Sequence, residues 1–232
     1  MDTGAVGVPE PTLGRSAIMT NRAFRVATAT RSSARRRSRC RRSSSRDDDG
    51  AVLVEAAIVM PLLLLIVFGI LEYGLVFRTT LSISESTRAG ARVAVAQPRV
   101  EGYEDSAAAA VSGALASAGI PADDIEELVI YKADPNTGQT VAGGAPQDCT
   151  ADCWKFVWSE GDQRFDLAPS SPTWEASSQF ACGSQDQTDF VGVYVRANYT
   201  FVTGFFGESM TMQERSVMRL EPLPLSDTCA PA

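Results

Sequence analysis

One apolar segment restricts the folds available to this chain more than any other feature. Residues 51–77 read AVLVEAAIVMPLLLLIVFGILEYGLVF, and the only charged side chains among them are Glu55 and Glu72. A helix of this length reaches about 40 Å, whereas a hydrocarbon core needs about 20 mostly apolar residues. Apolar side chains on every side do not suit a helix packed at the edge of a soluble core. We therefore expect residues 51–77 to form a transmembrane helix with the two glutamates near the membrane faces.

The charge of the chain changes sign just before this segment. Residues 1–50 carry 11 arginines and 5 acidic residues, whereas residues 51–232 carry 10 basic and 23 acidic residues. Because basic residues concentrate on the cytoplasmic side of membrane helices, the N-terminus is predicted to be cytoplasmic and the C-terminal part extracytoplasmic. A cleaved signal peptide fits less well, since the first small-residue site, Ala94-Val95-Ala96, lies far beyond the apolar stretch.

The leader, residues 1–50, is rich in arginine and serine and holds too few apolar residues for a core. We expect it to be disordered. Nucleic-acid-binding arms have a similar composition. This leader lacks interleaved aromatic residues, however, and its position before a membrane span explains its charge. Nucleic acid is therefore not an expected partner.

The residues around the start of the apolar segment form a known pattern. Gly50 is followed by four uncharged residues and then Glu55, at the start of a hydrophobic helix that follows a basic leader. This pattern resembles the cleavage region of type IV prepilins and pseudopilins, in which a membrane peptidase cuts after the glycine. The resemblance implies a cut between Gly50 and Ala51. Ala56 stands where Flp-type pilins commonly carry tyrosine, and both cleavage and retention of the leader are open.

The similarity extends over residues 50–92. Val54-Glu55-Ala56-Ala57, Pro61-Leu62-Leu63-Leu64, the run from Phe68 to Gly74 and the run from Thr87 to Arg92 occur in this order. They resemble the TadE-like family of tight-adherence (Tad) pilus biogenesis proteins. The resemblance implies a role in pilus assembly, with other pilin-like or Tad proteins, the membrane and a prepilin peptidase as partners. The motif residues that carry it are Pro61, Gly69, Tyr73, Gly74, Arg88, Gly90 and Arg92.

The two glutamates invite different interpretations. A carboxylate in a membrane helix is costly unless it has a partner, so such a residue is a functional candidate. For Glu55 the natural partner would be a free α-amino group of a processed subunit, and the alternative is a position in the headgroups. For Glu72, which lies beside Tyr73 at the level of an aromatic belt, we favour the headgroup position.

The remaining chain, residues 78–232, is predicted to form an α+β domain outside the membrane. Residues 79–96 should extend the membrane helix, and residues 103–118 should form a second helix that ends at Gly119. After this helix the spacing of apolar residues changes to every second position, which predicts strands at 127–133, around 139–142, at 190–202 and at 210–220. The spacing from Asp134 to Gly138 favours a turn over a calcium loop, because the twelfth position is Ala145. Residues 143–189 are expected to be irregular.

Cysteine placement suits an oxidising compartment. An even set of four lies in the exported part, and we prefer two disulfides, Cys149 with Cys153 and Cys182 with Cys229. A zinc site is the alternative, but the spacing lacks two matching C-x2-C pairs, so we expect no metal.

Composition also bears on the class of function. The chain has no histidine, so catalysis and metal binding that require histidine are excluded. No phosphate-binding glycine loop or nucleophile elbow is present. The acidic group Asp123, Asp124, Glu126 and Glu127 is interpreted as a solvated surface. We therefore expect a non-enzymatic assembly protein without cofactors. The alternative is a membrane-anchored binding module that recognises partners through Trp154, Trp158 and Trp174.

Overall fold

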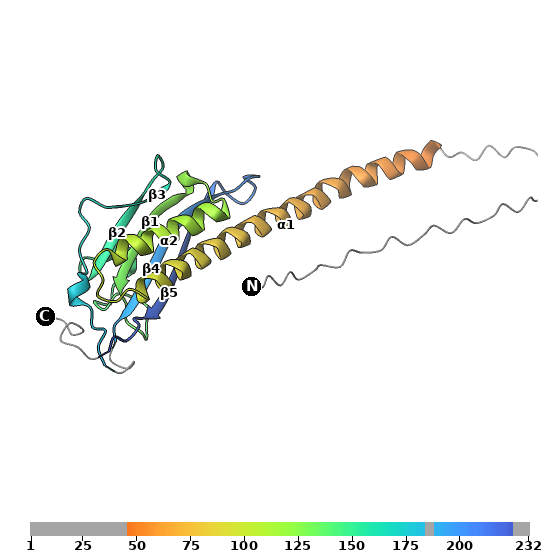
Figure 1. Ribbon diagram of the computed structural model, residues 1–232. Coiled ribbons are helices and arrows are strands. Elements are labelled where there is room, and N and C mark those ends of the chain that lie inside the picture. The colour runs from red at the N-terminus through yellow and green to blue at the C-terminus, as the bar shows by residue number, and fades with distance from the viewer. Residues whose placement is uncertain (1–45, 184–187, 225–232) are drawn as a thin grey trace, which may run out of the picture. The chain divides into compact units, whose positions relative to one another are not determined.

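A single long helix dominates the first part of the structure. The computed structural model describes residues 46–183 and 188–224. Within these, α1 runs from Arg46 to Val95, 50 residues without a break despite Pro61 (Figure 1). The predicted extension of the apolar helix through residues 79–96 is therefore confirmed. Most of the leader, residues 1–45, lies outside the described residues, and the predicted boundary between 77 and 78 falls inside α1.

The second helix, α2, spans Tyr103–Ala118, as the apolar spacing predicted. It ends because Gly119 adopts a left-handed conformation, with φ of 70°. In this conformation the Gly119 N–H donates to the carbonyl of Ala116 and the Ile120 N–H donates to that of Leu115. Glycine adopts it without a steric penalty, which makes it a common helix terminator.

Five strands form one antiparallel sheet in the order β3-β2-β1-β4-β5 (Figure 1). The strands are β1 Ile125–Lys132, β2 Cys153–Ser159, β3 Arg164–Leu167, β4 Phe190–Thr200 and β5 Ser209–Arg219. Short 3-10 helices occur at η1 Ala122–Asp124, η2 Pro146–Asp148 and η3 Ala176–Ser178. A long apolar helix followed by a helix and an antiparallel sheet is the α+β fold that the sequence predicted.

Two predictions about the strands were wrong. The segment 139–142 forms only an isolated bridge between Ala133 and Thr140, because its chain turns back at once through Gly143, where φ is 82°. The segment 143–189 is not irregular throughout, since it contains β2 and β3. In β2 the bulky residues Trp154, Phe156 and Trp158 alternate with others, a period of two that sequence analysis missed.

The turn after β1 has the form expected from its sequence. Oδ1 of Asp134 accepts hydrogen bonds from the N–H groups of Asn136 and Thr137, at 2.7 and 3.0 Å. Such a turn, closed by an aspartate side chain, is a usual way to reverse an antiparallel chain. The oxygen that a calcium loop would need is thus engaged by the backbone.

Both helices cover the same face of the sheet. The C-terminal half of α1 and one side of α2 bury their apolar side chains against alternate residues of β1 and β4 (Figure 1). The main residues of this core are Ile83, Ala91, Ala94, Tyr103, Val111, Leu115, Leu128, Ile130, Val191, Val193 and Val195. The local sequence pattern did not indicate that the long apolar helix would continue into the domain core.

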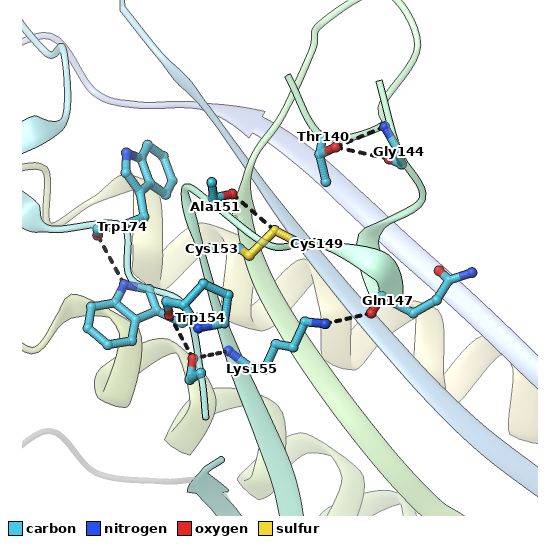
Figure 2. The surroundings of a disulfide bond; sticks show 11 residues. Thr140, Gly144, Gln147, Cys149, Ala151, Cys153, Trp154, Lys155 and Trp174 are labelled. Carbon is cyan, nitrogen blue, oxygen red and sulfur yellow. Dashed lines mark hydrogen bonds between the residues drawn. A yellow bond between two sulfur atoms is a disulfide. The ribbon is translucent and has the colours of Figure 1, made fainter. Parts of the chain in front are cut away.

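A smaller cluster lies on the opposite face of the sheet and contains the predicted disulfide. Cys149 and Cys153 are bonded and pack with Val129, Tyr131 and Tyr194 (Figure 2). This pairing, and the preference for a disulfide over zinc at these two cysteines, are confirmed. Cys182 is also disulfide-bonded. Its predicted partner, Cys229, lies outside the described residues, so that pairing stays a prediction.

Candidate assembly surface

The N-terminal half of α1 presents an apolar surface on all its sides. From Val52 to Leu71 its large apolar side chains are exposed by 39 to 72%. Of the helices in the described part of the chain, α1 alone is long and apolar enough to span a membrane. Its 21 residues from Ala51 to Leu71 measure about 31 Å along the helix, close to the thickness of a hydrocarbon core of about 30 Å. An apolar surface of this size needs a lipid or protein environment.

Gly90 explains one part of the sequence motif by packing. A Cβ atom at this position would lie 2.4 Å from Cγ2 of Val111 and 3.3 Å from the carbonyl oxygen of Ala107. Both residues are buried in α2. Only glycine lets α1 and α2 approach this closely, so Gly90 sets the contact between the two helices.

The other motif residues are spread along α1 rather than gathered in one place. Pro61 and Gly69 lie in the exposed apolar half, while Tyr73 and Gly74 lie where the helix meets the domain. Further on, Arg88 forms an exposed ion pair with Glu85 at 2.6 Å, and Arg92 is exposed. The motif therefore describes a helix and its packing, and the residues form no common pocket.

Glu72 occupies a position that sequence analysis did not predict. Its side chain is only 2% exposed, and its carboxylate accepts hydrogen bonds from the loop between β4 and β5. Oε1 accepts from the Val202 N–H at 2.7 Å, and Oε2 accepts from the N–H and hydroxyl of Thr203 at 3.1 and 2.9 Å. The carboxylate thus has partners within the protein that the headgroup interpretation did not include: it binds the protein's own backbone, which offers donors in place of water.

Tyr199 completes the surroundings of Glu72. Its hydroxyl donates to Oε1 of Glu72 at 3.4 Å. Burial, followed by the negative charge of Glu72, raises the pKa of Tyr199. The Tyr199 ring also contacts Phe201 edge-on, with ring centroids 5.5 Å apart. The Glu72 carboxylate of α1 thus accepts hydrogen bonds from Tyr199, Val202 and Thr203, and these bonds hold the helix to the end of the sheet.

The same loop, residues 201–208, packs aromatic side chains on α1. The Phe206 ring lies edge-on to Tyr73 with centroids 6.0 Å apart, and its Cζ would lie 3.5 Å from a Cβ at Gly69. The sequence signal for this contact is the pair Phe205-Phe206 between two glycines, a pattern that by itself indicates only a loop. The loop and residues 69–73 of α1 form what we call the collar.

Glu55 and the predicted cleavage position lie on the exposed half of α1. Within the described part of the chain, the Glu55 carboxylate makes no hydrogen bond or ion pair, and its side chain is exposed. Gly50 is helical and exposed, and a Cβ there would meet no atom within 4 Å. These positions leave Glu55 accessible to a partner outside this chain, and its role remains a prediction.

The tryptophans form part of the domain core rather than a recognition surface. Trp174 is 1% exposed, and its carbonyl accepts a hydrogen bond from the Tyr103 hydroxyl at 3.0 Å. The same carbonyl accepts one from Nε1 of Trp154, also at 3.0 Å (Figure 2). Trp158 packs edge-on against Phe165. These side chains hold the loops to α2, so the main sequence support for a binding module is lost.

The acidic group at the start of β1 is partly neutralised within the sheet. Both Glu126 and Glu127 form ion pairs with Arg196 of the neighbouring strand β4. The amide of Asn198 also donates to Glu126. Burial raises the pKa of Glu127, and the charge of Arg196 opposes that effect. These ion pairs stabilise one face of the sheet. The predicted solvated surface therefore fits Asp123 and Asp124 better than Glu126 and Glu127.

Comparison with known families agrees with the geometry. Residues 50–92 match the family model described as TadE-like protein, which covers the exposed half of α1, the collar residues of the helix and Gly90. The resemblance to TadE-like proteins is therefore confirmed over this segment. Comparisons with curated proteins and with solved structures gave no significant match.

The fold and the site define a protein with one helix suited to a membrane and a small α+β domain built on the same helix. The family match adds that residues 50–92 of this helix are similar to TadE-like proteins.

Proposed function

We propose that this chain is a non-enzymatic, single-pass membrane protein of a Tad-type pilus or secretion machine, a minor pilin or pseudopilin that packs through α1. One observation carries this proposal. The same continuous helix is apolar and exposed over Ala51–Leu71 and contributes Ile83, Ala91 and Ala94 to the domain core. Such a helix can leave lipid only where other apolar helices replace the lipid, which favours side-by-side assembly.

The topology we propose has the N-terminus in the cytoplasm and the domain outside. The arginine-rich leader supports the first part. The Cys149–Cys153 disulfide supports the second, since disulfides persist in oxidising compartments and are rare in the cytosol. Placing the domain outside also puts the acidic part of the chain away from the leader.

Cleavage after Gly50 by a prepilin peptidase belongs to the same proposal. It would leave an α-amino group on Ala51, four residues before Glu55 on an exposed helix. Residues three or four apart lie on one side of a helix, so a free amine at the new N-terminus and the Glu55 carboxylate would be positioned to pair within or between subunits. Mass spectrometry of the membrane-extracted protein tests this: peptides that begin at Ala51 are expected, and a mature protein that retains residues upstream of Gly50 would refute the cut.

Photo-crosslinking in the native cells tests the assembly role. A photoreactive amino acid at Leu63, in the exposed half of α1, is expected to crosslink to other pilin-like or Tad proteins. The same amino acid at Val141, exposed in a turn of the domain, is the control and should give few such adducts. Adducts with lipid alone at Leu63, together with absence of the protein from sheared filaments and assembly complexes, would contradict the proposal.

The genes beside this one give an independent check. A pilus ATPase, an inner-membrane platform protein and a prepilin peptidase encoded nearby are expected. An isolated gene would favour the anchored binding module.

A further inference from the structure

The loop from Phe201 to Glu208 exposes more apolar surface than a soluble hairpin normally does. Val202 is 75% exposed, Phe205 70% and Phe206 47%, and Glu208 is the only charged residue of the loop. Gly204 and Gly207, on either side of the two phenylalanines, have φ of 67° and 124°. Because these values favour glycine, the sequence builds a turn that presents both phenylalanines at its tip.

The position of this tip along α1 is fixed by contacts with the helix. Phe206 lies against Gly69 and Tyr73. Gly69 belongs to the 16-residue uncharged apolar stretch from Ala56 to Leu71, and it lies about 4.5 Å before Glu72 along the helix axis. If α1 spans a bilayer, the ring of Phe206 is at a level where lipid surrounds the helix.

We propose that the 201–208 loop is a second membrane-contacting element, which inserts Val202, Phe205 and Phe206 beside α1 into the leaflet nearest the domain. This inference rests on the proposed membrane span of α1. Its ligand is the boundary between headgroups and acyl chains, where aromatic residues are favoured and where apolar side chains bury to a depth of about 5–10 Å.

The hydrogen bonding in the first half of the loop suits that location. Irregular backbone is tolerated at membrane depth only where its polar groups have partners within the protein. The N–H groups of Val202 and Thr203 donate to Glu72, that of Phe201 donates to the Glu208 carbonyl at 3.0 Å, and that of Phe205 donates to the Thr203 hydroxyl at 3.5 Å. Glu72 therefore has a clear purpose here: it supplies acceptors to a loop that lipid could not solvate, and the loop donors in turn offset the cost of its charge.

Continuity with α1 favours the bilayer over a protein partner as the occupant of this surface. A groove lined by Phe68, Leu71, Gly74, Leu75 and Val202 connects the loop with the exposed apolar half of the helix. The two apolar surfaces thus form one continuous area, and any bilayer that covers α1 up to Leu71 also meets the loop.

Spin labelling of the full chain in vesicles of phosphatidylethanolamine and phosphatidylglycerol tests this inference. All variants are made in a parent chain in which Cys40, the cysteine of the leader, is replaced by serine, and this parent alone measures background labelling. Nitroxide labels are then attached at cysteines introduced in the loop by Phe205→Cys or Val202→Cys. Val141→Cys, in a turn whose backbone bonds to Lys132 at the far end of β1, is the matched control. Leu63→Cys reports on the span itself. Relaxation by oxygen, which concentrates in lipid, is compared with relaxation by a water-soluble nickel chelate.

We expect several-fold higher oxygen-to-nickel accessibility at positions 205 and 202 than at 141, with depths of about 5–10 Å below the phosphates, and the greatest depth at 63. The insertion would be overturned, and the span left intact, if the labels at 205 and 202 were as accessible to nickel as the label at 141 while the label at 63 reported lipid. Shielding of both loop positions from both reagents would overturn it in favour of a protein partner. Absence of lipid contact at 63 would instead refute the proposed span as well.

Discussion

The contact between Glu72 and the loop gives the sharpest prediction about this protein. In Glu72→Ala, the part-buried N–H groups of Val202 and Thr203 and the hydroxyls of Thr203 and Tyr199 lose the acceptor that lies 2.7 to 3.4 Å away. A buried donor without a partner costs about 1–3 kcal/mol. Because four donors are affected, and lipid or water can replace the carboxylate only in part, we expect loop docking to weaken by roughly 3–6 kcal/mol.

Glu72→Gln should have a smaller effect, because an amide retains one acceptor oxygen. Each carboxylate oxygen serves two donors, so the variant keeps one pair of hydrogen bonds, without charge, and turns its NH2 group toward the other pair. We expect a loss of roughly 2–4 kcal/mol. The loop should detach from α1 while the sheet and α2 remain folded, since the core does not depend on these bonds.

Amide hydrogen exchange measures this directly. If the loop opens locally, exchange at Val202 and Thr203 in Glu72→Gln should accelerate by roughly 30- to 1000-fold, and by more in Glu72→Ala. Glu85→Gln is the matched control: it removes a carboxylate from the same helix, but one whose side chain is 65% exposed and paired only with Arg88. Exchange at Val202 and Thr203 that is unchanged in Glu72→Ala would refute the role we assign to this residue.

Three further predictions concern the domain. Gly90→Ala should lower the free energy of unfolding, measured by chemical denaturation, by about 1–3 kcal/mol through overpacking against α2. The control Gly113→Ala, at an open position of α2, should raise it by about 0.5–1 kcal/mol. Equal effects of the two substitutions would contradict the close helix contact. Replacing Cys149 and Cys153 with serine should lower the free energy of unfolding by roughly 2 kcal/mol, because the unfolded chain gains loop entropy. An unchanged midpoint of chemical denaturation would show that the disulfide contributes little. Burial raises the pKa of Tyr131 to about 12. Since the folded state retains this proton to higher pH than the unfolded state, the free energy of unfolding should fall as the pH rises from about 10 to 12, by up to roughly 2–3 kcal/mol. Tyr131→Phe should show a weaker fall.

Features that depend on neighbouring residues in the sequence were predictable. The helix at Tyr103–Ala118 followed from apolar spacing and Gly119, and β4 followed from the alternation of valines with polar residues. The strands β2 and β3 were missed because they are short and lie among turns, although the tryptophans of β2 alternate. In α2 and β4 the period extends over three or more repeats, which is enough to identify the element, whereas the wrongly predicted strand at 139–142 is too short for that.

The collar was not predictable from local pattern, because its two halves are far apart in the chain. Glu72 and Val202 are separated by 130 positions, and neither segment alone indicates the other. A glutamate beside a tyrosine at the end of an apolar helix reads as a headgroup contact, and two phenylalanines between glycines read as an ordinary loop. Only the register of β4, which brings Tyr199 and Val202 to α1, joins them into one structure.

The collar also lies where two glycines weaken α1, one within it and one directly after it. Gly69 and Gly74 both occur here, and each glycine in a helix interior costs about 1 kcal/mol relative to alanine. No flexible linker separates the membrane part of α1 from the part inside the domain, so bending at these glycines would be the way to change the angle between them. Phe206 covers Gly69 and the loop backbone binds Glu72, on the helical turn between the two glycines. The collar therefore stiffens a segment that would otherwise bend, so that the orientation of the domain follows that of the exposed apolar half of α1.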